Sequence, residues 1–375
     1  MRIVMLLAKS TGGIGIHVDA LTRELRRLGH QVVIATDTLT ADTFGWDAEL
    51  LWPNNPGGMP GAARHLRHLA RGADVVHAHG HQAGTLAALA LTGLGRRDRP
   101  ALVVSLHNAV LGGRRRQVAG RLTARPFARV AQLVTGASSA LVEQARAWGA
   151  GWAELAPVPS PRVPALLAAP VLDLDERRAR AADLLADQRI PAAPDADLVV
   201  TVARIAPQKD LPTLVAAAAM DREAGGPTDR VWVVVGGGDE ALRAELEHQA
   251  REQGAPVHFV GAQSDPSEWL QAASLFVLTS HWEARALVVQ EARAAGTPVI
   301  ARDTGGLRDL VDGVGTLVAG ADPVDWAAAV GEVIEGRGVW HTQSEAGRER
   351  AATWDDDAGN ATRWVSLYAR ARAMT

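Results

Sequence analysis

The sequence contains no cysteine in its 375 residues, so disulfides, thiolate zinc sites and cysteine nucleophiles are all excluded. It has no excess of positive charge either: the formal net charge is −3, whereas a general nucleic-acid binder is basic. We therefore expect no nucleic acid among its partners. No stretch approaches the roughly 20 apolar residues that span a bilayer, and the apolar run at the amino terminus is too short for a signal peptide. These absences favour a cytoplasmic chain.

Lysine is nearly absent from the sequence. Of 39 basic residues, only Lys9 and Lys209 are lysine. The compact ammonium of lysine suits a terminal phosphate better than the planar guanidinium of arginine does, so the position of Lys209 is informative. This lysine lies in the segment ARIAPQKD (203–210), which also offers Arg204. The competing interpretation is a chance position on the solvated surface, where most charged residues lie.

The sequence does contain a regular alternation of short β-branched runs with amphipathic or Ala-rich segments, which predicts parallel sheets covered by helices on both faces. The first series of expected strands spans 2–8, 31–36, 74–79, 101–107 and 132–137. The second series spans 198–203, 230–236, 256–261, 274–280, 298–301 and 315–318. At 375 residues the chain is long for one domain. The predicted fold class is therefore α/β, with two doubly wound, Rossmann-like domains facing each other across a cleft.

A Pro- and Ala-rich break at 157–196 separates the two series, and we interpret it as the interdomain connection with a charged helix in its middle. We place the amino-terminal domain at 1–165, and the linker with the carboxyl-terminal domain at 166–350. The remaining segment, 351–375, is expected to be a helix that packs back on the amino-terminal domain through Trp364, Leu367 and Tyr368. Segments 39–61 and 108–126 carry no readable motif and are expected to be loops.

Two glutamates, Glu283 and Glu291, lie eight positions apart after one expected strand, and Arg204 and Lys209 follow another. Ligands of doubly wound sheets bind outside the carboxyl ends of the strands, so we expect these four side chains to share one site. Two carboxylates can hold sugar hydroxyls while two cations hold a diphosphate, as the recognition of a sugar nucleotide requires. The competing interpretation of Glu291 is an ordinary exposed residue on a helix.

A helix is expected to begin near Ala286 and to end at Gly296, with its first amides pointing at a phosphate. Three glycine-rich loops also follow expected strands: Ser10–Gly15, Gly236–Gly238 and Thr304–Gly306. Glycine there lets the backbone approach a ligand, although a tight connection alone would also explain it. The first loop is not GxGxxG, so it does not match the dinucleotide-binding motif.

Histidines and arginines are the candidate site residues of the amino-terminal domain. His77, His79 and His81 alternate in HAHGH, which resembles a metal cluster, but no acidic residue lies beside them to orient the rings. We therefore predict no metal, and expect these rings to pack or to line an acceptor site. His107 ends a strand in SLHN and is expected to point into the cleft. The run Arg114–Arg116 is either a solvated face or a contact for an anionic acceptor or membrane surface.

Together these motifs resemble the large family of retaining GT-B glycosyltransferases, the glycosyl transferases group 1, which includes sucrose synthases, glycogen synthases and bacterial mannosyl- and N-acetylglucosaminyltransferases. The resemblance covers nearly the whole chain. In the second domain it is specific, with R-x4-K at Arg204 and Lys209, E-x7-E at Glu283 and Glu291, then EARAAGTPVIA and GG. In the first domain it is looser, and the matching segments are GGIG, VVHAHG and SLHN.

The resemblance implies a role for each matching residue. Arg204 and Lys209 would hold the donor diphosphate. Glu283 would contact the donor-sugar hydroxyls and Glu291 the ribose hydroxyls, while His107 would lie beside the reacting sugar. The other donor-binding residues are implied to be Gly13 near the phosphates, Ala262 and Gln263 near the base, Ala286, Leu287 and Val288 through backbone amides, and the loop glycines Gly15 and Gly237.

The sequence departs from the family pattern at two places. Where the family often has Phe-Gly within the acidic motif, this chain has Arg285–Ala286, and an arginine there could reach the donor or acceptor and alter the choice of sugar. Where the family has Pro-Asn-Gly between the domains, this chain has PVPSPR (157–162), a change that we interpret as structural.

The expected function is that of a hexosyl-type glycosyltransferase that moves a sugar, with retention, from a nucleotide diphosphate to an acceptor hydroxyl. UDP-linked glucose or N-acetylglucosamine is the first expected donor, and GDP-mannose the next. Cations and helix amides can stabilise the leaving diphosphate, so neither a metal nor another cofactor is expected. No carboxylate nucleophile is predicted, in contrast to retaining glycosidases.

The acceptor and two other function classes stay open at this point. The acceptor is a small molecule, a lipid or a polysaccharide, and the Arg-rich 108–126 segment favours an anionic one or a peripheral contact with the inner face of an anionic membrane. One alternative is a sugar-nucleotide epimerase or hydrolase of the same architecture, which would act without an acceptor. The other is a non-catalytic protein that binds nucleotide or a partner subunit.

Overall fold

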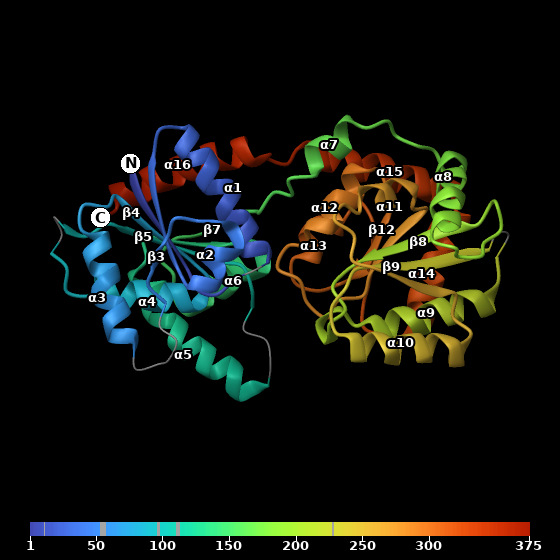
Figure 1. Cartoon of the computed structure of the whole chain (residues 1–375), viewed down its shortest axis with the longest axis horizontal. Helices are drawn as coiled ribbons and strands as arrows, with labels where there is room; N and C mark the ends of the chain where they lie inside the picture. Colours follow the sequence, from blue (N-terminus) through green and yellow to red (C-terminus); the bar gives the residue numbers. More distant parts are fainter. Residues whose placement is uncertain (11, 53–57, 96–97, 110–112, 227–228) are drawn as a thin grey trace. The chain divides into compact units, whose positions relative to one another are not determined.

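In the computed structural model the chain forms two compact units, and the structure describes all residues except 11, 53–57, 96–97, 110–112 and 227–228 (Figure 1). Unit 1 comprises Met1–Pro159 and Asp355–Thr375, and unit 2 comprises Ser160–Trp354. The observed boundaries therefore lie at 159/160 and 354/355, a few residues from the expected 165/166 and 350/351. Both chain termini belong to unit 1.

Within the described residues, unit 1 is built on a seven-stranded parallel sheet in the order β3-β2-β1-β4-β5-β6-β7. Its strands are β1 Arg2–Leu7, β2 Gln31–Thr36, β3 Glu49–Leu50, β4 Val75–His79, β5 Ala101–Leu106, β6 Leu133–Gly136 and β7 Ala153–Leu155. Its helices are α1 Gly13–Arg27, α2 Thr38–Phe44, α3 Met59–Ala70, α4 His81–Leu91, α5 Arg114–Val130, α6 Ser139–Trp148 and α16 Asp357–Ala373. The order reverses between β1 and β4, so the loops after these strands diverge.

Unit 2 repeats the plan with a six-stranded parallel sheet, in the order β10-β9-β8-β11-β12-β13 for the described residues. Its strands are β8 Asp197–Val202, β9 Arg230–Val235, β10 Val257–Gly261, β11 Leu275–Leu278, β12 Val299–Arg302 and β13 Thr316–Val318. The other elements are α7 Val163–Ala168, α8 Leu174–Asp187, the 3-10 turn η3 Pro207–Lys209, α9 Leu211–Ala224, α10 Glu240–Gln253, α11 Ser267–Ala272, α12 Leu287–Ala294, α13 Leu307–Val311, α14 Pro323–Glu335 and α15 Arg337–Ala352.

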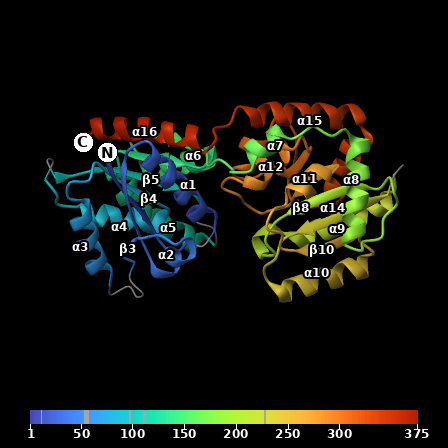
Figure 2. The ribbon, with the colours of Figure 1, turned by 45° about the horizontal axis from the view of Figure 1, so that its top comes forward.

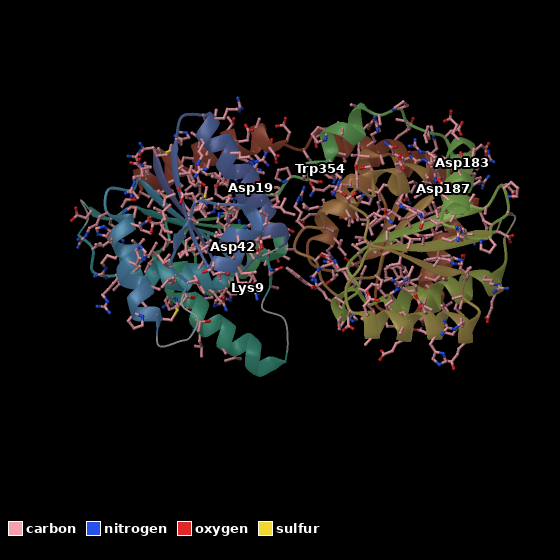
Figure 3. All side chains as sticks on the ribbon, in the orientation of Figure 1. Lys9, Asp19, Asp42, Asp183, Asp187 and Trp354 are labelled. Carbon is pink, nitrogen blue, oxygen red and sulfur yellow. The ribbon has the colours of Figure 1, made fainter. Side chains whose placement is uncertain are left out.

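The apolar strands are buried on both faces because successive side chains point to opposite sides of the sheet. In β8, Leu198 and Val200 pack among α8, α11 and α12, while Val199 between them packs on the other face among α9, α10 and α14. Figure 2 shows α11 and α12 on one side of β8 and α9 and α10 on the other. Continuous apolar runs therefore predict these strands better than alternation would. On α8 the solvent side carries Asp183 and Asp187, which are labelled in Figure 3.

The last helix, α16, packs into the core of unit 1, beside α1 (Figure 1). Trp364, Leu367 and Tyr368 are all buried there against the sheet, on the side of the helix that the sequence predicted. Because Asp355–Thr375 follows the whole of unit 2 in sequence, unit 1 is completed only by residues from the end of the chain.

Three expectations about segments were wrong. The break at 157–196 is more than a connection, since Val163, Leu166, Ala181 and Leu185 belong to the core of unit 2. The expected loops at 39–61 and 108–126 contain α2 and most of α5, and the side chains of Arg114–Arg116 lie outside the described residues. Strands β3 and β7 were missed because they are short edge strands without an apolar run.

Candidate functional site

The sequence-predicted residues of unit 2 gather at the carboxyl ends of its strands, around the point where β8 and β11 lie side by side and the strand order reverses. In a doubly wound sheet the loops that leave this point diverge, and ligands bind there. The contributing loops follow β8 at 203–210, β9 at 236–238, β10 at 262–265, β11 at 279–286 and β12 at 303–306.

Lys209 and Glu283 come from different loops and form an ion pair, with Lys209 Nζ 2.6 Å from Glu283 Oε1. Their side chains are only 14% and 12% exposed. The turn η3 is tied to the β11–α12 loop by the His281 amide, which donates to the Gln208 carbonyl (2.9 Å), and by Gln208 Nε2, which donates to the Trp282 carbonyl (2.7 Å). One backbone bond and one side-chain bond of Gln208, the residue before Lys209, therefore hold the two loops together beside the ion pair.

Asp210, which the sequence analysis did not single out, holds the backbone that presents Lys209. It adopts left-handed dihedrals, φ 49° and ψ 46°, which few residues other than glycine, asparagine and aspartate accept. Its carboxylate pairs with Arg302 and accepts a bond from Thr213 Oγ1 at 2.9 Å. Thr279 Oγ1 lies 3.0 Å from the carbonyls of both Lys209 and Asp210. An aspartate directly after the lysine was the only signal of this role in the sequence.

Arg204 is exposed, and its side chain makes no hydrogen bond or ion pair with the described residues. The backbone around it is held by the glycine loop after β9. A Cβ on Gly236 would lie 1.9 Å from the Ala203 carbonyl oxygen, and one on Gly238 would lie 2.3 Å from the Ile205 carbonyl oxygen. These glycines therefore allow the chain after β9 to lie against the chain after β8 that carries Arg204.

Gly237 lies next to Ala262, which with Gln263 is an expected base contact. The Gly236 amide donates to the Gly261 carbonyl at 2.8 Å, and a Cβ on Gly237 would lie 3.4 Å from Ala262 Cβ. Ala262 and Gln263 are exposed at the end of β10. Their side chains and backbone are thus available to a ligand.

Glu291 is 1% exposed, so the competing interpretation of an exposed helix residue is wrong. Ser160 Oγ donates to Glu291 Oε1 at 2.6 Å, and Arg162 NH1 lies 3.4 Å from the same oxygen. The second oxygen, Oε2, is buried and has no hydrogen-bond partner among the described residues. Ser160 and Arg162 belong to PVPSPR, where this chain departs from the family pattern, and the sequence analysis did not assign them to the site.

The amino terminus of α12 completes the arrangement of this unit. The helix begins at Leu287 after the cap residue Ala286, and the amides of Leu287 and Val288 have no acceptor among the described residues. The Gly306 amide donates to the Glu283 carbonyl at 2.8 Å, which ties the β12 loop to the acidic segment. This geometry offers free backbone amides next to the loop that carries Glu283.

Arg285 packs against the last residue of unit 2. Its guanidinium carbon is 5.4 Å from the ring centre of Trp354, the last residue of unit 2, which is labelled in Figure 3. Arg285 NH2 also lies 3.4 Å from Gln290 Oε1. These contacts give the arginine a packing role that accounts for its presence without any contact with a sugar.

In unit 1, the three histidines whose ring nitrogens converge are His17, His79 and His107, and of these only His79 belongs to HAHGH. His77 in β4 lies 2.7 Å from both the Tyr368 hydroxyl and Ser105 Oγ, whereas His81 begins α4 and lies 2.7 Å from Thr123 Oγ1. His79 instead joins His107 after β5, with 3.0 Å between His79 Nδ1 and His107 Nε2. His17 of α1 joins them, and one ring nitrogen of each of these three residues lies within 4.8 Å of the others.

These three imidazoles are uncharged at neutral pH because they are buried. Burial, with the charges of His107 and Arg363 adding to it, lowers the pKa of His17 to about 3. Burial lowers the pKa of His107 to about 4, and that of His79 well below its usual value. Neutral imidazole is the form that binds transition metals, but no described carboxylate bonds these rings and the Arg363 charge opposes a dication. The absence of a metal stays a prediction.

The first glycine loop is placed at the start of α1. Gly13 is the first residue of the helix and is exposed, with no atom within 4 Å of where a Cβ would stand. Gly15 has a packing reason to be glycine, because its Cβ would lie 2.3 Å from the Phe44 ring. Thr11 of this loop lies outside the described residues.

A cavity of about 670 Å³ lies elsewhere in unit 2, beside β10 and α10. Its lining includes Arg189, Arg222, Arg243 and Arg251, and none of the predicted site residues. We place the candidate site at the strand ends instead, because ligands of doubly wound sheets bind outside the carboxyl ends of the strands. Among the described helices, none is both long and apolar enough to cross a membrane.

Two all-parallel, doubly wound units, one with paired cations and carboxylates at its strand ends, define a protein of the GT-B class. Residues 185–350 match the model of the glycosyl transferases group 1, and residues 11–161 match that of glycosyltransferase family 4. The chain belongs to the family of group 1 glycosyltransferases. The family prediction and the prediction of an α/β fold with two doubly wound domains are therefore confirmed.

Related proteins agree with this placement. The chain is 40% identical over 178 residues to D-inositol 3-phosphate glycosyltransferase 2 of Catenulispora acidiphila. The matched region covers 44% of this chain and 41% of the relative. It is 35% identical over 199 residues to D-inositol 3-phosphate glycosyltransferase of Streptosporangium roseum, covering 50% and 46%. The chain thus spans less than half the length of these curated relatives.

Solved structures share the fold over the whole chain. Anabaena HepE in complex with UDP superposes with a TM-score of 0.80 at 19% identity, covering 98% of this chain and all of that one. Sucrose-phosphate synthase from Thermosynechococcus elongatus superposes with a TM-score of 0.77 at 22% identity, covering both chains completely. At these identities the likeness establishes the fold.

Proposed function

We propose that this protein transfers a sugar from a nucleoside diphosphate to an acceptor hydroxyl, with retention at the anomeric carbon and without a metal. The observation that carries the proposal is the convergence of Lys209, Glu283 and the free amides of α12 at the switch point of the second sheet, with Arg204 exposed nearby. Family membership supports the same reaction.

The donor diphosphate is held by Arg204, Lys209 and the amides of Leu287 and Val288. Cleavage of the bond to the diphosphate develops negative charge on the leaving oxygen, and preorganised cations and amides stabilise that charge most effectively. Because Lys209 pairs with Glu283 in the structure, we expect the donor to loosen this pair, with the phosphate taking the ammonium and a sugar hydroxyl taking the carboxylate.

The nucleoside is held by Glu291 and by the loop after β10. A buried carboxylate oxygen without a partner is costly, and a ribose hydroxyl would supply the missing donor to Oε2. Since this oxygen is shielded from solvent, we expect a local side-chain shift when the hydroxyl reaches it. Ala262 and Gln263 read the base from their exposed position.

Retention follows if the acceptor hydroxyl attacks from the face that the diphosphate leaves, with its proton passing to the departing phosphate oxygen. His107, neutral because burial lowers its pKa to about 4, offers a hydrogen bond beside the sugar rather than a charge. UDP-glucose and UDP-N-acetylglucosamine are the first donors to test, since HepE is known in complex with UDP and UDP-glucose. GDP-mannose is the next.

The acceptor that we would test first is D-inositol 3-phosphate, because the curated relatives are named for it. Lipid and polysaccharide acceptors form the second panel. Transfer to an anionic lipid acceptor would indicate a peripheral contact with an anionic membrane. The Arg-rich start of α5 motivates the choice of anionic acceptors.

The first experiment is a thermal-shift panel of UDP, GDP, ADP and their sugars, with and without magnesium. A nucleotide at 100 times its dissociation constant should add about 2.7 kcal/mol to the free energy of unfolding. We expect one nucleotide to shift the midpoint equally in both buffers, and transfer to follow with the sugar of that nucleotide. A shift without turnover would favour a non-catalytic binder, turnover without acceptor would favour an epimerase or hydrolase, and no shift at all would exclude the proposal.

The site assignment is tested by substitution of its charged residues. Lys209→Ala and Glu291→Ala should each lower the transfer rate at least tenfold, which corresponds to about 1.4 kcal/mol of barrier. Arg243→Ala is the matched control, since it also removes an ion pair of unit 2, with Glu247 at 2.9 Å, while its side-chain bonds go to Glu247 and the Phe259 carbonyl and to none of the assigned site residues. Wild-type rates in both site variants would refute the assignment.

A further inference from the structure

The carboxylate of Glu291 is held asymmetrically by the segment that departs from the family pattern. Ser160 Oγ and Arg162 NH1 both approach Oε1, at 2.6 and 3.4 Å, while Oε2 has no partner among the described residues. Ser160 is buried, and its Oγ also lies 3.4 Å from the Arg162 amide. One oxygen of the carboxylate is therefore fixed, and the other keeps an unused capacity to accept a hydrogen bond.

The same arginine reaches the loop after β10. Arg162 Nε lies 3.2 Å from Asp265 Oδ1, and Arg162 NH2 donates to the Ser264 carbonyl at 3.0 Å. Bonds from Ser267, with the Arg162 charge adding to them, lower the pKa of Asp265, so this ion pair is present at neutral pH. The guanidinium thus joins Glu291 of α12 to the loop that begins at Ala262.

A planar guanidinium suits this task because its nitrogens form several directed bonds at once, which a lysine ammonium on a flexible stem does not. Rotation of the Glu291 carboxylate would exchange its two oxygens or turn both away from a ligand. Two donors on Oε1 oppose that rotation. The bonds to Ser264 and Asp265 hold the neighbouring loop at a set distance from the same carboxylate.

We infer that Ser160 and Arg162 are positioning residues for nucleoside recognition: they aim Glu291 Oε2 at the ribose hydroxyls and hold the base loop beside it. The inference rests on the proposed function, because it deepens the assignment of Glu291 to the ribose. It predicts that selection for the ribose hydroxyls depends on Ser160 and Arg162, two residues that need not touch the nucleotide.

The test compares the binding of UDP and of 2′,3′-dideoxy-UDP to the full chain by titration calorimetry. The wild type should bind UDP at least tenfold more tightly, and Glu291→Gln should bring the ratio close to one. Arg162→Ala and Ser160→Ala should each reduce the ratio at least threefold, and Arg162→Lys should fall between Arg162→Ala and wild type. The control Arg243→Ala removes an arginine that donates to the Phe259 carbonyl of β10 at 3.2 Å, and should keep the wild-type ratio.

Thermal unfolding of each variant shows whether it is folded. If Arg162→Ala does not fold, the binding ratio of Ser160→Ala decides the test. A wild-type ratio in folded Arg162→Ala and Ser160→Ala overturns the inference while leaving the proposed function intact. A wild-type ratio in Glu291→Gln also overturns it, since the ribose would then be held elsewhere. Failure of the wild type to bind any of UDP, GDP or ADP is a different result, and it removes the proposed function itself.

Discussion

Asp210 illustrates how one residue with unusual dihedrals can set the position of a functional side chain. Its left-handed backbone turns the chain immediately after Lys209, and its carboxylate is held by Arg302 and Thr213. A strained conformation persists only where the surroundings over-determine it, and here they do so beside the Lys209–Glu283 pair.

Alanine usually gives a more stable protein than glycine, and at position 210 we expect the opposite order. Alanine in the left-handed region costs about 1–2 kcal/mol, whereas glycine accepts it freely. We expect Asp210→Ala to be less stable than Asp210→Gly by about 1 kcal/mol in chemical denaturation, and Asp210→Asn to be more stable than both. If Asp210→Ala equals or exceeds Asp210→Gly in stability, the backbone at 210 is not left-handed in solution.

At the scale of elements, the glycine loop after β9 is required by contact between two chain segments. Gly236 and Gly238 lie so close to the carbonyls of Ala203 and Ile205 that a Cβ would meet backbone, which has little room to move. The loop is therefore part of what holds Arg204 in place, whether or not a ligand is bound.

Gly236→Ala should lower the free energy of unfolding by about 1–3 kcal/mol, the usual cost of overpacking. Gly338→Ala in α15 is the matched control, because nothing lies within 4 Å of its Cβ position and alanine favours a helix by about 0.5–1 kcal/mol. Urea unfolding of both variants measures the difference. Equal stabilities would mean that the β8 and β9 loops are further apart than the structure shows.

Helix α16 packs part of the hydrophobic core of unit 1, although the rest of that unit lies before unit 2 in sequence. Trp364 and Tyr368 are buried against the sheet, and the Tyr368 hydroxyl lies 2.7 Å from His77 Nδ1. Burial raises the pKa of the Tyr368 phenol well above its usual value, so the hydroxyl keeps its proton and can donate.

Trp364→Ala should destabilise unit 1 by about 3–5 kcal/mol, as for other large core aromatics. We expect hydrogen exchange to accelerate in β1 and β5 before it does so in β8 and β9. Trp326→Ala, which empties a fully buried position in the core of unit 2, should show the opposite order. The same order in both variants would contradict the assignment of α16 to unit 1.

At the scale of the whole molecule, the buried histidines of unit 1 make stability depend on pH. The unfolded chain binds protons at these rings near pH 6.5, whereas His107 and His17 in the folded chain bind them only near pH 4 and pH 3. Between these values the unfolded state holds more protons, so the free energy of unfolding falls as the pH falls from about 6.5 toward 4.

His17→Gln should reduce this pH dependence by up to about 1.4 kcal/mol per pH unit, which is the linkage slope for one proton. Urea unfolding at pH 7, 6, 5 and 4.5 measures the slope. His248→Gln, on the exposed face of α10, is the control and should keep the slope of the wild type. An unchanged slope in His17→Gln would mean that this ring is protonated in the folded chain.

Most of the fold could be predicted from the sequence because its signals are local. Apolar runs and Ala-rich segments marked the long strands and most of the helices, since burial on both faces of a parallel sheet requires them. The short edge strands β3 and β7, and the helix α5 with Pro126 inside it, carried no such signal. The motifs also placed Arg204, Lys209, Glu283 and Glu291 at strand ends, where topology alone predicts a site.

The sequence by itself determined the fold class, the family and the candidate site residues at the strand ends, because these depend on spacing along the chain. Only the tertiary structure decided which residues hold those groups in place. Ser160 and Arg162 meet Glu291 across about 130 positions, and Asp210 meets Arg302 across 92. Contacts between residues so far apart in sequence arise from the packing of whole elements, so the local sequence does not predict them.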